Sequence, residues 1–104
     1  GAFPHLGVNA ADAMVVAQTA IGLLRQQLRT TDRVHGIVTH GGDAPNVIPA
    51  HTSARYAVRA SVIGDLVDVR DKVFRCFEAG ALATGTSTRT SLTTSTILGC
   101  WRAV

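Results

Sequence analysis

The stretch Gly41-Gly42-Asp43-Ala44-Pro45-Asn46-Val47-Ile48-Pro49 separates two segments rich in β-branched residues, so it predicts the turn between two strands. Its paired glycines allow positive φ angles, and its two prolines stiffen the backbone around Asn46. Arg59 follows thirteen residues beyond Asn46, at the end of the second strand. An amide and a guanidinium held on stiff backbone suit a carboxylate, so we expect the two to converge on one anionic group.

The segments on either side of this turn carry strand patterns. Residues 33–40 include Val34, Ile37 and Val38, which favour a short strand. In residues 52–60, Thr52 and Tyr56 share one side while Arg55 and Arg59 share the other. The second segment therefore predicts a half-buried strand that presents Arg59 outward.

Two helices frame these strands. In residues 9–28, Asn9 is expected to cap the start, and apolar positions recur at steps of three and four. They are Met14, Ala17, Ile21, Leu24 and Leu28. The second helix is predicted from an Asp65 cap to about Leu82, with Gly85 as its stop.

The chain beyond Gly85 is harder to assign. Residues 86–91 are rich in threonine and predict a weak strand, while residues 96–101 form either a further strand or a loosely held tail. The order helix, strand, strand, helix, weak strand predicts an α+β, ferredoxin-like two-layer sandwich (split β-α-β), with two helices on one face of an antiparallel sheet. Its first strand is missing from this chain, so we expect the weak strand at residues 86–91 to lack a partner.

Composition limits the classes of function. The chain has 104 residues, 46% hydrophobic and 16% charged, which predicts one globular domain over residues 1–104. Its net charge is +3, but its basic residues form no run and aromatic residues are 5%, so we expect no nucleic-acid partner. We expect no membrane partner and a cytoplasmic location, because apolar runs are short and no signal peptide is visible. Cys76 and Cys100 are expected as free thiols.

Three motifs together resemble a known family. They are the glycine-rich turn with Arg59, Gly7-Val8-Asn9-Ala10 at the first helix, and Ala79-Gly80-Ala81-Leu82-Ala83-Thr84-Gly85 at the end of the second. They are similar to the dimerisation (lid) domain of the di-zinc amidohydrolases that include aminoacylase and carboxypeptidase G, in the branch like aminobenzoyl-glutamate utilisation protein B. The resemblance covers residues 1–85 and leaves residues 86–104 as an atypical tail. The family's opening strand would precede Gly1.

The resemblance implies a dimerisation and substrate-recognition domain of a metal-dependent amidohydrolase or carboxypeptidase that cleaves N-acyl amino acid or peptide-like amide bonds. It implies substrate binding by Asn46 and Arg59, with Gly41, Gly42 and His40 beside them. It also implies a homodimer through strand 33–40 and helix 9–28, and a separate catalytic domain that holds zinc and receives a small carboxylate-bearing substrate.

Catalytic chemistry is not expected in this chain itself. It has one glutamate, Glu78, and no His-x-Asp sequence, so we expect neither a metal site nor catalytic residues, and no hydrolysis by the chain alone.

Other interpretations stay open at this point. Asn46 is also suited to closing the loop by an Asx turn, and Arg59 to being a solvated strand charge. The chain also fits a free-standing α+β small-ligand-binding or regulatory dimerisation module without catalysis, or a remnant of a longer protein. A flanking catalytic half in the gene would separate these alternatives.

Overall fold

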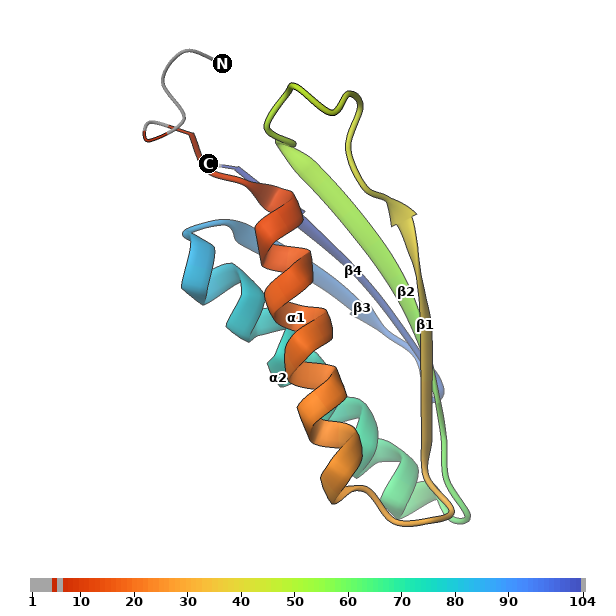
Figure 1. Ribbon diagram of the computed structural model, residues 1–104. Helices are drawn as coiled ribbons and strands as arrows, with labels where there is room; N and C mark the ends of the chain where they lie inside the picture. The colour runs from red at the N-terminus through yellow and green to blue at the C-terminus, as the bar shows by residue number, and fades with distance from the viewer. Residues whose placement is uncertain (1–4, 6, 104) are drawn as a thin grey trace.

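The computed structural model describes residue 5 and residues 7–103. Its elements are α1 (Ala10–Leu24), the 3-10 turn η2 (Arg25–Gln27), β1 (Arg33–His40), β2 (His51–Arg59), α2 (Ile63–Thr84), β3 (Ser87–Leu92) and β4 (Thr96–Arg102). The two helices cover one side of a four-stranded antiparallel sheet, as Figure 1 shows. This confirms the predicted α+β architecture. We call the uncovered side of the sheet the open face; strand β2 presents Ser53, Arg55, Ala57 and Arg59 there.

The helix ends follow local chemistry. The Asn9 side chain accepts hydrogen bonds from the backbone N–H groups of Ala11 (2.8 Å) and Asp12 (3.3 Å), which confirms the predicted cap. The predicted start of the second helix was wrong: α2 begins at Ile63, and no side chain caps it. Asp65 instead lies in the first turn, where its carboxylate complements the helix dipole. Gly85, at φ 74°, ends α2 as predicted.

The core joins the helices to the two central strands. Trp101 of β4 and Phe77 of α2 are fully buried, with ring centroids 5.1 Å apart. The indole Nε1 of Trp101 donates a hydrogen bond to the Phe77 carbonyl at 3.0 Å. Tyr56 of β2 meets the Phe77 ring edge-on at 5.6 Å. Cys76 and Cys100 are free, as expected, and burial raises the pKa of the Cys76 thiol.

Strand β4 fills the central place that the sequence analysis left empty. The sheet order is β1-β2-β4-β3, so β4 pairs with β2 on one side and with β3 on the other. The expectation that the strand after α2 would lack a partner was therefore wrong, and the chain end is not a loose tail. In Figure 1 the end of β4 lies beside the start of α1. Strand β4 thus occupies the position in the sheet that was expected for the missing first strand, which would lead into α1.

Backbone contacts connect this chain end to the start of α1. The N–H of Ala103 donates to the Ala50 carbonyl, and the N–H of Ala10 donates to the Pro49 carbonyl, both at 2.9 Å. The buried Thr52 hydroxyl donates to the Ala10 carbonyl at 2.7 Å. Residues at the start of β2 therefore hold the beginning of α1 and the end of β4 together.

Two helical glycines should respond oppositely to alanine. A Cβ on Gly80 would lie 2.2 Å from the Ala13 carbonyl oxygen, because the two helices cross closely there. Gly80→Ala is expected to lower the free energy of unfolding by about 1–3 kcal/mol. Gly22 in α1 has nothing within 4 Å of such a Cβ, so Gly22→Ala is expected to raise it by about 0.5–1 kcal/mol. Urea unfolding of the two variants measures both changes; equal effects would contradict the close crossing.

Candidate functional site

The loop between β1 and β2 has the geometry that its glycines and prolines predict. Gly42 has a φ of 133°, and a Cβ there would lie 3.0 Å from the Pro49 ring. The Val47 N–H donates to the Ala44 carbonyl at 3.2 Å, which closes a turn around Asn46. The Asn46 side chain is exposed and, within the described residues, forms no hydrogen bond, so the Asx turn is not observed. Its amide is left available to a ligand.

Two histidines stand at the base of this loop. The His40 and His51 rings stack with centroids 5.2 Å apart, and His40 Nε2 lies 3.8 Å from the Asp43 carboxylate. The strand register shifts between Val38 and His40. The pKa of His51 is lowered, first by burial and then by the positive charges of Arg102 and His40, while Asp43 opposes the shift. Among the described residues no group of three or more His, Cys, Asp or Glu is suited to hold a metal ion.

Arg59 lies at the other end of β2. His51 begins the strand next to the loop and Arg59 ends it, which separates their Cα atoms by roughly 27 Å in extended backbone. Arg59 is exposed and pairs in register with Arg33 at the start of β1. The structure therefore gathers Gly41, Gly42, His40 and Asn46 at one end of the sheet. It does not bring Arg59 to Asn46 within one protomer.

Strand β1 is an edge strand with apolar side chains on both sides. Ile37 on the open face is 54% exposed, and Val38 on the helix side is 44% exposed. The helices pack over β2, β4 and β3 and leave β1 at the margin. The other edge, β3, has the sequence Ser-Thr-Arg-Thr-Ser-Leu, which is polar except for Leu92. An exposed apolar edge strand is suited to pair with another strand.

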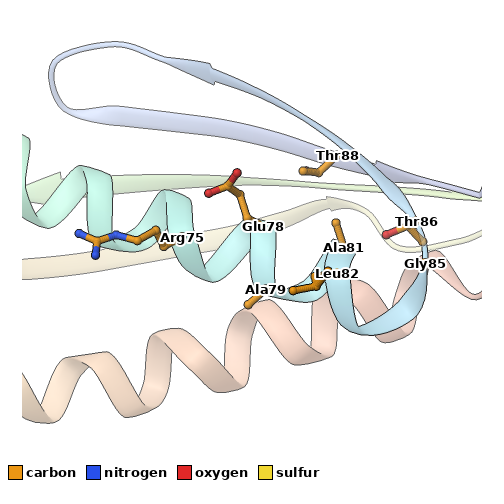
Figure 2. A pocket seen from close by; sticks show the side chains of 8 residues that line it. All are labelled: Arg75, Glu78, Ala79, Ala81, Leu82, Gly85, Thr86 and Thr88. Atoms are coloured by element: carbon orange, nitrogen blue, oxygen red, sulfur yellow. The ribbon is translucent and has the colours of Figure 1, made fainter.

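A hollow of about 730 Å³ lies away from these residues, between the end of α2 and the start of β3 (Figure 2). Its lining includes Arg75, Glu78 and the 88% exposed side chain of Leu82. No residue that was predicted as a site residue from the sequence lines it.

Neither helix has the length and hydropathy to cross a bilayer, so the described residues include no membrane-spanning helix.

Fold and site together define a small α+β association domain with a sheet edge open for pairing. Comparison with protein families agrees with this class. Residues 1–84 match the family described as the peptidase dimerisation domain. The chain belongs to that family, which confirms the resemblance found in the sequence.

Characterised relatives share most of this chain. It is 48% identical over 84 residues to the Xaa-Arg dipeptidase of Mus musculus and 42% identical over 83 residues to that of Homo sapiens. It is 35% identical over 85 residues to one of the chains of the p-aminobenzoyl-glutamate hydrolase of Escherichia coli (strain K12). These matches cover 80–81% of this chain but 18–20% of each relative. The chain thus spans about a fifth of their length.

Proposed function

We propose that this chain is the dimerisation and substrate-recognition (lid) domain of a zinc-dependent amidohydrolase that cleaves N-acyl amino acids or peptide-like amides. Its membership of the peptidase dimerisation domain family supports this proposal. The substrates in the relatives' names, a dipeptide ending in arginine and p-aminobenzoyl-glutamate, both have an amide bond near a free carboxylate. The zinc ions belong to a separate catalytic part, since zinc needs several convergent ligands.

The observation that carries the proposal is the apolar edge of β1. Two copies of β1 related by a two-fold axis pair antiparallel and make one continuous sheet, which removes both exposed edges. The exposed Ile37 side chains of the two copies then lie near each other on the open face, and the exposed Val38 side chains lie near each other on the helix side. On α1, Val15 and Leu23 are 59% and 62% exposed and extend the apolar surface available to a second copy.

This pairing would also reunite the two predicted recognition residues. Because β2 is antiparallel to β1, the two copies of β2 run in opposite directions in the joined sheet. The Asn46 end of one protomer then lies at the same end of the sheet as the partner's Arg59. Three strand spacings, about 14 Å, separate the two β2 strands. A substrate carboxylate and the long arginine side chain bridge that distance.

In this arrangement each residue has a distinct role. The Arg59 guanidinium binds the substrate carboxylate in a bidentate way, through two charge-assisted hydrogen bonds. Asn46 donates from its amide to the carboxylate or to the neighbouring substrate amide. Gly41 and Gly42 let the loop backbone approach closely, and His40 adds an imidazole hydrogen bond beside them. Each site of the dimer thus uses both protomers.

A charge placed on the β1 edge should break the dimer. Ile37→Lys is expected to raise the dimer dissociation constant roughly 100-fold, because two like charges would be brought together in the joined sheet. Leu92→Lys on the polar β3 edge is the matched control, since Leu92 is 39% exposed. Sedimentation equilibrium of the 104-residue chain measures both variants. Dissociation of the Leu92→Lys dimer with an intact Ile37→Lys dimer would place the interface on β3.

A further inference from the structure

The open face of the sheet gathers arginines that are scattered in the sequence. Residues directly opposite in an antiparallel pair share a face, so the register assigns each strand residue to a side. The open face receives half of the ten Arg and Lys residues of the chain. They are Arg33, Arg55, Arg59, Arg89 and Arg102.

Most of these guanidinium groups have no partner within the described residues. Arg33 donates to the carbonyls of Thr30 and Asp32, but the side chains of the other four form no hydrogen bond or ion pair there. Three cations of the helical side are paired with carboxylates: Arg29, for example, reaches Asp32 at 3.2 Å and Asp65 at 3.4 Å, and Arg70 and Lys72 also form ion pairs. The open face is therefore an uncompensated positive surface.

The carboxylates lie elsewhere. Those of α1 and α2 are in the helical layer, and Asp32 and Asp43 are in the segments that precede β1 and β2. Among the described acidic residues, Asp43 alone stands near the open face, beside His40. The pKa of His51 is lowered first by burial and then by the positive charges of Arg102 and His40, and the last two causes agree with a positive potential at that end of the face.

The basic side chains form a ladder along the strands. Successive open-face rows are two residues apart, about 6.6–6.8 Å. Each of five successive rows contains at least one basic side chain. The rows are His51 with Arg102, Ser53 with Arg89, Arg55 with Leu98, Ala57 with His35, and Arg59 with Arg33.

The middle of the face adds apolar and hydroxyl groups. Ile37 and Leu98 lie in the row of Arg55, and Leu98 is 44% exposed. A shallow hollow of about 500 Å³ there is lined in part by Ser53, Arg89 and Leu98. The Tyr and Trp side chains of the sheet, Tyr56 and Trp101, are buried on the helix side, so within the described strands no Phe, Tyr or Trp ring is available to stack on a nucleobase.

We infer that the open face binds an extended acidic segment of a partner protein, with carboxylates at every second residue. An extended chain repeats every two residues at the same spacing of about 6.6–6.8 Å as the ladder of basic rows. Unpaired arginines bind its carboxylates through charge-assisted hydrogen bonds, and Ile37 and Leu98 contact the CH2 groups of the acidic side chains, which lie on the same side of the segment. Pairing through the β1 edge leaves this face uncovered, so the inference does not depend on the proposed enzyme activity.

A peptide titration tests this inference on the 104-residue chain. The probe is a fluorescent peptide of about ten residues that alternates glutamate and valine, which spans five rows. Fluorescence anisotropy at low ionic strength should show saturable binding that weakens as salt is added. The Arg55→Gln and Arg89→Gln double variant is expected to bind about tenfold more weakly. The Lys72→Gln and Arg75→Gln double variant in α2 is the matched control, because it removes the same charge, and it should bind like wild type.

Three results would overturn the inference. The first is no saturable binding by the wild-type chain. The second is equal weakening by the α2 double variant and by the open-face double variant, which would indicate net charge alone. The third is tighter binding of a single-stranded thymidine oligomer of equal charge, which would point to nucleic acid instead. Circular dichroism of each variant confirms that the fold is kept.

Discussion

Replacing Trp101 by alanine is expected to lower the free energy of unfolding by about 3–5 kcal/mol, a large share of the roughly 5–15 kcal/mol typical of a domain. The indole is fully buried in the central strand, packs on Phe77 and donates to its carbonyl. Its loss leaves a cavity and a buried carbonyl without that donor. The expected result is a chain that is largely unfolded or only marginally folded.

A neighbour on the same strand gives the control. Leu98 lies on the open face of β4 and is 44% exposed, so Leu98→Ala should change the free energy of unfolding by less than about 0.5 kcal/mol. Urea denaturation followed by far-UV circular dichroism compares the two variants. Equal stability of Trp101→Ala and wild type would show that β4 does not occupy the centre of the sheet.

The second large effect concerns substrate recognition. In the enzyme that we propose contains this domain, Arg59→Ala is expected to raise KM for a carboxylate substrate roughly 10- to 100-fold, because a bidentate charge-assisted pair is lost. Asn46→Ala, which removes a neutral donor, should raise it roughly 2- to 10-fold. Steady-state hydrolysis of p-aminobenzoyl-glutamate and of a dipeptide ending in arginine measures both.

A modified substrate separates recognition from general damage. When the recognised carboxylate is converted to an amide, wild type should lose affinity, and Arg59→Ala should cause little further loss. Arg75→Ala, an exposed arginine of α2, should leave KM unchanged for both substrates. An equal effect of Arg59→Ala on the acid and on the amide would exclude the carboxylate contact.

The local elements of the fold could be predicted because their signals are local. Asn9 caps α1, Gly85 ends α2 in the left-handed region, and the Gly-Gly turn joins β1 to β2. The start of α2 was missed because Asp65 resembles a cap and yet serves in the first turn. The place of β4 was missed because strand order depends on long-range pairing, and Thr96 to Arg102 carries no signal for its neighbours.

The sites show the same limit. Their spacing along the chain suggested that Asn46 and Arg59 act together. The extended strand β2 lies between them, however, and places them at opposite ends of the sheet. The arginines of the open face form no run in the sequence. Arg55 and Arg89 come together only because β2 and β3 both pair with β4. The positive charges are therefore dispersed along the sequence but gathered on the open face.

Mixed dimers test most directly whether one site uses two protomers. Co-expressed Asn46→Ala and Arg59→Ala chains form heterodimers in which one site lacks both residues and the other keeps both. With random pairing, about half of the dimers are heterodimers, and each has one complete site of two. We therefore predict that about a quarter of all sites contain both residues and show the wild-type KM. Activity no higher than the mean of the two separate variants, with no wild-type KM component, would contradict a site shared between protomers.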